Sequence, residues 1–508
     1  MSDGYPAPAV RNFITASVMA ATVMNSLDST IANVALPHIQ GSVAASADEI
    51  SWVLTSYIVA AAITIPLTGW AAERFGRKRL IMASIIGFTI VSGLCGLATN
   101  LGELVGLRLA QGIAGAALVP MSQAILLDIN PPERHGPAMA VWGMGAILGP
   151  IIGPALGGWL TDNFSWRWVF YINIPIGIVA CIGLSIFLTE SRTSAKAKLD
   201  AFGFATLALA LGSLQLMLDR GQTQDWFNSN EICLETASMA FFGYLFVAHT
   251  LTARKPFIDL SLFADRNFAM STLLGFFLGV LLFGVLALLP PMLENLMNYP
   301  VVLTGLVTAP RGVGTLISMV LVGRLIRIVD ARLLVFVGFS LAAYSMYRMS
   351  GFSLGMNQNL VISSGFIQGL GTGLIFVPLS TMAFATLDTR LRNEGAAMFT
   401  LIRNVGSAVG ISVLNAMTIR NAATVHARLA EGIRPDHPAL ARYMPGFDFD
   451  VPVQVARLNA AITGQASMVS YIDTFWALFI VSLLVMPVIL LMRAPGRAGA
   501  EPISMHMD

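Results

Sequence analysis

A long series of apolar segments, each about 20 residues long, dominates the chain of 508 residues. Charged or Pro/Gly-rich loops separate these segments. A helix satisfies its own backbone hydrogen bonds in lipid, so segments of this length predict an all-α polytopic membrane protein. We place fourteen transmembrane helices at residues 12–35, 51–71, 80–98, 104–126, 138–160, 168–188, 201–218, 232–252, 267–289, 301–322, 333–350, 360–384, 395–418 and 470–492.

The composition agrees with a membrane location. Only 11% of the residues are charged, whereas ordinary soluble domains carry about 25%. A net charge of +2, with the basic residues sorted by loop, argues against a nucleic-acid partner. Three cysteines without metal-ligand spacing, and histidines confined to loops and helix ends, indicate neither a disulfide nor a metal site. We therefore expect no cofactor and no enzyme active site.

Lysine and arginine are concentrated in every second loop, for example at residues 74–79 and 324–332. Short loops on the other side contain few of them. Cytoplasmic loops hold the excess of basic residues in membrane proteins. We therefore expect both termini to be cytoplasmic.

Two pairs of similar segments indicate an internal repeat. "GAALVPMS" (115–122) resembles "GLIFVPLS" (373–380), and "GPAM" (136–139) resembles "GAAM" (395–398), at nearly equal offsets. Chance similarity among apolar segments is the alternative. The repeat predicts three parts: an N-terminal six-helix bundle at 1–190, two inserted transmembrane helices at 191–255, and a C-terminal six-helix bundle at 256–508 that includes a long periplasmic loop at 420–468.

A polar half of the first helix, "MNSLDSTIANVALP" (24–37), must face water or polar protein. Asp28 lies about 10 Å below the outer end of its helix, and Arg108 lies about 6 Å below the outer end of the fourth, at 1.5 Å per residue. The two side chains can therefore reach each other. Either they form a pair that only neutralises itself, or Asp28 takes up and releases a proton as its exposure changes.

The loop "GWAAERFGRKRLI" (69–81) follows the second helix. Positive-inside anchoring explains its basic residues but not its glycines or Glu73. Asp128, at the inner end of the fourth helix, has the depth to pair with an arginine of this loop. We expect a conformational latch made of Gly69, Glu73, Arg74, Gly76, Arg77, Lys78 and Asp128.

The stretch "GAILGPIIGPALGGW" (145–159) concentrates small residues and prolines within an apolar helix. Glycines every four residues form one row along a helix, and such a row lets another backbone approach closely in lipid. We expect the row to pack against the second six-helix unit, at the helix 301–322. The motif comprises Gly145, Gly149, Pro150, Gly153, Pro154, Gly157 and Gly158.

Together these motifs resemble the major facilitator superfamily, specifically the fourteen-helix drug:proton antiporters of the EmrB/QacA type. The loop 69–81 is similar to the superfamily signature Gly-x-Leu-Ala-Asp-Arg-x-Gly-Arg-Lys, with Ala71 and Glu73 as departures. "LDSTIANVALP" (27–37) and "RLAQG" (108–112) resemble the family's first-helix and fourth-helix motifs, and 145–159 resembles its antiporter motif. "WRWVFYINIPIG" (166–177) and "YIDTFW" (471–476) are most similar to EmrB-like permeases.

The resemblance implies a fold of two six-helix bundles plus two inserted helices, in the bacterial inner (cytoplasmic) membrane. It implies proton-coupled efflux of amphipathic drugs or toxic small molecules by alternating access. The arginine of the fourth-helix motif, here Arg108, is implicated in proton transfer in the family. The family often has a glutamine where this chain offers Glu294, which is either a second titrating group or a solvated helix end.

The resemblance also implies partners, namely small amphipathic substrates, protons, membrane lipid, and a periplasmic adaptor of the EmrA type with an outer-membrane channel. The segment 420–468 either contacts such an adaptor or is a solvated loop. An exporter dedicated to one endogenous metabolite, siderophore-like compound or lipid is the alternative function. For the substrate cavity we select six polar residues at membrane depth: Asn25, Asn33, Tyr57, Gln111, Gln368 and Arg403.

Overall fold

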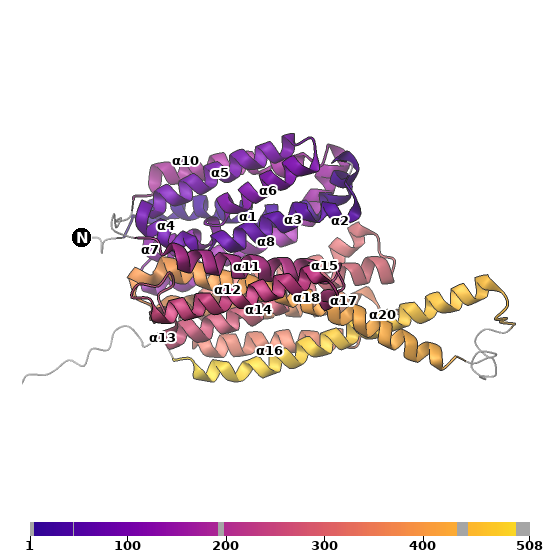
Figure 1. The fold of residues 1–508 in the computed structure, drawn as a ribbon. Coiled ribbons are helices and arrows are strands. Elements are labelled where there is room, and N and C mark those ends of the chain that lie inside the picture. Colours follow the sequence, from indigo (N-terminus) through magenta and orange to yellow (C-terminus); the bar gives the residue numbers. More distant parts are fainter. Residues whose placement is uncertain (1–4, 44, 191–197, 434–445, 494–508) are drawn as a thin grey trace, which may run out of the picture.

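The computed structural model describes residues 5–43, 45–190, 198–433 and 446–493. Within these ranges the chain forms helices and connecting turns, with no strand. Figure 1 shows the long helices lying side by side, with their axes running in roughly the same direction. This is the arrangement that the apolar segments predict.

The helices of the first half and the inserted pair have the following bounds: α1 Pro8–Val43, α2 Ala47–Ile50, α3 Trp52–Thr64, α4 Leu67–Phe75, α5 Arg77–Leu97, α6 Leu101–Gly115, α7 Leu118–Ile129, α8 His135–Asn163, α9 Trp168–Tyr171, α10 Asn173–Phe187, α11 Ala201–Arg220 and α12 Asn230–Thr252. The remaining helices are α13 Ser261–Ala264, α14 Arg266–Pro291, α15 Val301–Leu325, α16 Ala331–Met349, α17 Gln358–Ala385, α18 Arg392–Glu431 and α20 Pro452–Val485.

Eleven helices of the described chain are long and apolar enough to cross a membrane, and the bent pair α3 and α4 makes a twelfth span. The pair bends by 57° beside Pro66, which has no N–H to continue the helical ladder. Two further helices, α1 with 36 residues and α16 with 19, have the necessary length but are less apolar. Each of the fourteen predicted segments thus corresponds to one helix or one interrupted helix.

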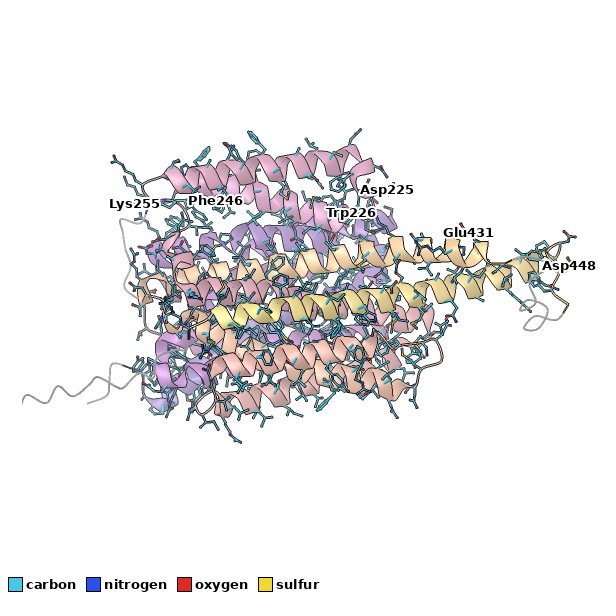
Figure 2. The ribbon with its side chains drawn as sticks, turned by 90° about the horizontal axis from the view of Figure 1, so that it is seen from below. Asp225, Trp226, Phe246, Lys255, Glu431 and Asp448 are labelled. Carbon is cyan, nitrogen blue, oxygen red and sulfur yellow. The ribbon has the colours of Figure 1, made fainter. Side chains whose placement is uncertain are left out.

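The contacts between helices form two groups. In the first group, α1 packs on α7, α8 and α10, and α6 packs on α3 and α5. In the second group, α17 packs on α14, α15 and α16, and α18 packs on α14 and α20. The groups meet where α8 contacts α15 and α17, and where α4 and α7 contact α18. Helices α11 and α12 pack on each other and form one edge of the bundle in Figure 2. The division at 190 and 255 remains a prediction.

Helices α18 and α20 extend well beyond the other helices as a hairpin, seen in both figures. The expectation of a loop over 420–468 is wrong for its described parts, because α18 continues to Glu431 and α20 begins at Pro452. Across the hairpin, His426 Nε2 lies 3.0 Å from Asn459 Oδ1. A search for apolar segments overlooks such helices, since helices outside the membrane carry polar side chains. Residues 434–445 lie outside the described ranges.

We call the end of the bundle that carries Arg74–Arg79 the basic end and the opposite end the hairpin end. The N-terminus, α4, α7 and α13 lie at the basic end, on the left of Figure 1.

Candidate functional site

A fully buried ion pair lies inside the first group of helices. Asp28 of α1 and Arg108 of α6 are both 0% exposed, and Arg108 Nη1 donates to Asp28 Oδ2 at 2.7 Å. The pairing predicted from the depths of the two residues is confirmed. A charge at membrane depth is costly unless it is paired, so each residue stabilises the other there.

Two amides complete the shell around Asp28. Gln111 Nε2 and Asn173 Nδ2 donate to Asp28 Oδ1 at 2.9 Å and 2.8 Å. The carboxylate thus accepts three hydrogen bonds from three donors on two other helices. Asn173 of α10 also donates to Ser92 Oγ at 3.0 Å. We call Asp28, Arg108, Gln111 and Asn173 the carboxylate cluster.

Aromatic and backbone groups of α3 surround Arg108. Its Nε donates to the carbonyl of Val53 at 3.0 Å, and its guanidinium lies 4.3 Å from the centre of the Tyr57 ring. Asn25 Nδ2 donates in turn to the Tyr57 hydroxyl at 3.0 Å. Asn25, Tyr57 and Gln111, three of the residues selected for the substrate cavity, therefore belong to the surroundings of the ion pair. Asn33 is exposed on α1.

The carboxylate cluster can hold a proton or a negative charge. Protonation of Asp28 would remove the counter-charge of Arg108 and would turn an acceptor into a donor that faces two amide N–H groups. A protonated Asp28 would therefore need a different set of hydrogen-bond partners. Among the described side chains, Arg108 Nη2 and Asn173 Oδ1 are buried without a partner, so donors and acceptors remain for a second arrangement.

At the basic end, Asp128 of α7 links the two groups of helices. It forms an ion pair with Arg77, which confirms the predicted pairing with an arginine of the loop 69–81. Sequence reasoning missed its second partner, Arg392 of α18, at 3.3 Å. Asp128 of α7 thus forms ion pairs with both α5 and α18.

Other residues of the predicted latch lie around this contact. Gly69 packs against Glu394 of α18, and a Cβ at Gly69 would lie 3.0 Å from the Glu394 Cα. A larger residue at this position would therefore push the two groups of helices apart. Gly76 has a φ of 91°, which favours glycine. Lys78 Nζ donates to the carbonyl of Ser185 at 2.8 Å. Glu73 is exposed and Arg74 is half-buried.

A polar contact next to this region joins α18 to the segment before α13. The backbone N–H of Asp259 donates to Glu394 Oε1 at 2.5 Å. The Ser261 hydroxyl, hydrogen-bonded to the Asp259 carboxylate, holds the pKa of that carboxyl below its ordinary value. Asp259 therefore stays charged beside Arg390, whose Nη2 lies 3.4 Å away.

The glycine row of α8 packs against α1, so the expectation that it packs against the second six-helix unit is wrong. A Cβ at Gly149 would strike the backbone of Ser26, and one at Gly153 would strike the Thr30 hydroxyl. Ser26 Oγ donates to the carbonyl of Ala146 at 2.5 Å. Gly145 and Gly157 of the same row meet Met19 and Ile31 of α1.

The physical reason is that spacing reveals a close-packing face but not the helix that covers it. A different face of α8 does reach α15, where Ile151 covers Gly312. Of the other residues of the motif, Pro154 is exposed and Pro150 is half-buried. Gly158 lies off the row, with Val34 Cγ1 3.8 Å from the position of a Cβ.

The remaining predicted residues lie in the second group of helices. Gln368 of α17 is buried, with its Oε1 lacking a partner among the described residues. Arg403 of α18 has its guanidinium 5.4 Å from the centre of the Phe376 ring. Glu294 is half-buried in a π-helical turn, Met292–Leu296.

Comparison with known proteins gives a family for this arrangement. The family model described as Major Facilitator Superfamily matches residues 18–411. The chain belongs to this superfamily. It is 35% identical over 491 residues to the multidrug export protein EmrB of Escherichia coli (strain K12), covering 96% of each chain. It is also 35% identical to the fatty acid resistance protein FarB of Neisseria gonorrhoeae, covering 96% of this chain and 97% of FarB.

Solved structures show the same superfamily fold. The human organic anion transporter MFSD10 superposes with a TM-score of 0.59 at 14% identity, covering 94% of this chain and 100% of that one. The proton:xylose symporter XylE superposes with a TM-score of 0.61 at 14% identity, covering 93% and 95%. The predicted all-α membrane fold of the superfamily is therefore confirmed.

Asn173 is the residue of the carboxylate cluster that sequence reasoning missed. It is an asparagine inside the apolar stretch "YINIPIG", and a buried amide at membrane depth needs polar partners. That signal could have placed it with Asp28.

Proposed function

We propose that the chain is a proton-coupled exporter of amphipathic drugs or toxic small molecules, working by alternating access in the bacterial inner membrane. The single observation that carries this proposal is the carboxylate cluster, a buried acid held by one cation and two amides. Relatives that match nearly the whole chain are named multidrug export proteins, which supports efflux as the direction of transport.

Asp28 is the proposed proton carrier. Its protonation neutralises α1 next to Arg108 of α6 and weakens the attraction between the two helices. Helix α1 also carries Ser26 and Thr30, which fit the glycine row of α8. Because α8 contacts α15 of the other group, a shift of α1 reaches the boundary between the two halves. Proton uptake and the rocking of the halves are coupled along this path.

Proton entry supplies enough energy for export. One charge that crosses about 100 mV releases about 2.3 kcal/mol. That energy sustains roughly a fiftyfold substrate gradient, since 1.4 kcal/mol corresponds to a factor of ten. The proposed mechanism therefore needs no nucleotide hydrolysis.

The basic end is proposed to face the cytoplasm, with both termini on that side. Asp128, Arg392 and the Gly69–Glu394 contact join the two groups of helices there. These contacts support a conformation that is closed toward the cytoplasm. In this proposal Asn33 and Glu294 line the path toward the hairpin end, and Glu294 is either a second titrating group or a solvated helix end.

The hairpin of α18 and α20 is proposed to contact a periplasmic adaptor of the EmrA type, which would lead to an outer-membrane channel. Its length supports this role, since it reaches beyond the rest of the bundle (Figure 2). The alternative is a solvated hairpin without a partner.

A second candidate function is an exporter dedicated to one endogenous compound. The relative named for fatty acid resistance supports a narrower cargo such as a lipid. A resistance profile of a pump-deficient bacterial host that expresses this chain distinguishes the two functions. Resistance to several unrelated toxins supports the multidrug exporter, whereas an unchanged profile across chemically varied toxins contradicts it and favours the dedicated exporter.

A further inference from the structure

Ser92 of α5 holds the amide of Asn173 in one orientation. The Ser92 hydroxyl donates to the carbonyl of Phe170 at 2.9 Å, so its single hydrogen is in use. The same oxygen accepts a hydrogen bond from Asn173 Nδ2 at 3.0 Å. Ser92, Asn173 and Asp28 are all 0% exposed, so bulk water does not compete for these bonds. While Ser92 donates to Phe170, the Asn173 amide therefore turns its N–H groups toward both Ser92 and Asp28.

This orientation of the Asn173 amide suits an ionised Asp28. Asn173 Nδ2 lies 2.8 Å from Asp28 Oδ1, and a carboxylate can only accept hydrogen bonds. A protonated Asp28 would carry an O–H group, for which the surrounding N–H donors offer no acceptor. A buried donor without an acceptor is costly. Proton uptake therefore requires that an acceptor turn toward Asp28.

The two amides of the carboxylate cluster differ in their freedom to supply that acceptor. Gln111 Oε1 already accepts from Arg108 Nη1 at 2.8 Å and from the Cys95 thiol at 3.6 Å. Asn173 Oδ1, in contrast, is buried without a partner among the described residues. Turning the Gln111 amide would break both bonds of its oxygen, whereas the Asn173 oxygen has none to lose. Asn173 is therefore the amide that can turn at the lower cost.

The Ser92 hydroxyl can follow such a turn, because a hydroxyl both donates and accepts. When the Asn173 amide turns over, Oδ1 takes the place of Nδ2 between Asp28 and Ser92. This oxygen can accept from the protonated carboxyl group and from the Ser92 hydroxyl, which exchanges Phe170 for Asn173 as its acceptor. One amide atom lacks a partner in either orientation, Oδ1 before the turn and Nδ2 after it. The turn therefore leaves no additional amide atom unpaired.

We propose that Ser92 and Asn173 form a hydrogen-bond switch that follows the protonation of Asp28. With Asp28 ionised, Asn173 donates to Asp28 and Ser92 donates to Phe170. With Asp28 protonated, Asn173 Oδ1 accepts from both Asp28 and Ser92. The proton stays on the carboxyl group, and only hydrogen bonds change partner. Ser92 is thus a positioning residue, since it acts on Asp28 through Asn173. A role of the switch in export rests on the proposed function of Asp28 as the proton carrier.

Infrared spectroscopy of the full-length protein in nanodiscs tests the switch. The asparagines are isotopically labelled at the side-chain carbonyl carbon, and difference spectra are recorded between acidic and alkaline buffer. In the unmodified protein we expect a carboxyl band of Asp28 and a shift of one asparagine carbonyl band to lower frequency in acid, because Asn173 Oδ1 gains two hydrogen bonds. Asp28→Asn should abolish both changes. Asn173→Ala should abolish the asparagine shift but keep a carboxyl band of Asp28.

Variants of Ser92 separate hydrogen bonding from packing. Ser92→Ala leaves a small cavity, whereas Ser92→Cys fills the space with a thiol, which is a weak donor and acceptor. Both should shrink the asparagine shift, because Asn173 Oδ1 then gains one full hydrogen bond in place of two. Ser482→Ala is the matched control, since Ser482 is also 0% exposed but donates to the carbonyl of Leu478 on its own helix. Its difference spectra should equal those of the unmodified protein.

Several results would overturn the proposal. An asparagine shift that persists in Asn173→Ala, or that both Ser92 variants leave unchanged, contradicts the switch. A smaller shift in Ser92→Ala alone shows a packing effect and also overturns it. A carboxyl band of Asp28 without an asparagine shift refutes the switch and leaves the proton carrier standing, whereas the absence of that carboxyl band contradicts both. Because the spectra need neither substrate nor a proton gradient, a failure of coupled export leaves their outcome intact.

Discussion

Replacement of Asp28 and Arg108, singly and together, separates a coupling role from a purely structural one. Asp28→Asn keeps the size of the side chain but removes the counter-charge of a fully buried arginine. Arg108→Gln leaves the carboxylate with two amide donors and no cation. The double variant removes both charges and keeps groups that can form hydrogen bonds.

The burial of the pair sets the size of the effect. Removing one partner of a buried ion pair destabilises a protein by about 3–5 kcal/mol, whereas replacing both partners is often nearly neutral. Both residues are 0% exposed, so the full range applies to each single variant. We expect Asp28→Asn and Arg108→Gln each to lower the free energy of unfolding by about 3–5 kcal/mol. The double variant should recover most of that lost stability. Export should be lost in all three, because none retains an acid that carries the proton next to a cation.

Thermal unfolding of the purified protein reports the stability, and substrate accumulation in energised everted membrane vesicles reports export. Asp473→Asn is the matched control, because Asp473 also accepts a hydrogen bond from an amide, that of Asn421 at 2.6 Å, but lies at the base of the hairpin. The control should export normally. Proton-driven export by the double variant at the unmodified rate would refute the reasoning, since the pair would then only neutralise itself.

Three further predictions follow from the packing. Gly153→Leu should abolish export without preventing membrane insertion, because its side chain would strike α1; transport and surface labelling measure the two effects. Asp128→Asn should loosen the basic end, because it removes the shared partner of two arginines; spin labels at Glu133 and Arg390 should move apart. Replacing residues 426–459 with a short flexible linker should abolish capture of an EmrA-type adaptor in pull-down but leave substrate binding intact.

Each of these predictions has a control or a contradicting outcome. Gly158→Leu, off the glycine row, should retain export, and normal export by Gly153→Leu would contradict the packing of α8 on α1. Asp330→Asn, which removes an acid that pairs with Arg332 two residues further along the chain, should leave the spin-label distance unchanged. An unchanged distance in Asp128→Asn shows that the latch does not hold the halves together. Full adaptor capture by the variant that lacks residues 426–459 would show that the adaptor docks on another surface.

The helices and the two ion pairs of the first half could be predicted from the sequence. Helix length follows from bilayer thickness, and the depth of a charge along its helix limits which partner it can reach. These two constraints suffice to pair Asp28 with Arg108 and Asp128 with the loop 69–81, as the structure confirms.

Features that depend on which helices are neighbours were missed. The glycine row shows that something approaches closely, but only the three-dimensional arrangement shows that it is α1. Asn173 and Arg392 contact their carboxylates from helices α10 and α18; a polar residue at membrane depth signals that Asn173 needs a partner, but only the helix arrangement shows which carboxylate each residue meets. A search for apolar segments predicts a loop at the hairpin because these parts of α18 and α20 carry many polar side chains.

Substrate-induced proton release tests the central claim, that proton and substrate are exchanged through Asp28, most directly. Purified protein in weakly buffered detergent solution is mixed with an exported compound, and a pH-sensitive dye follows the released protons. The account predicts proton release from the unmodified protein and none from Asp28→Asn. Equal release from Asp28→Asn would contradict the account.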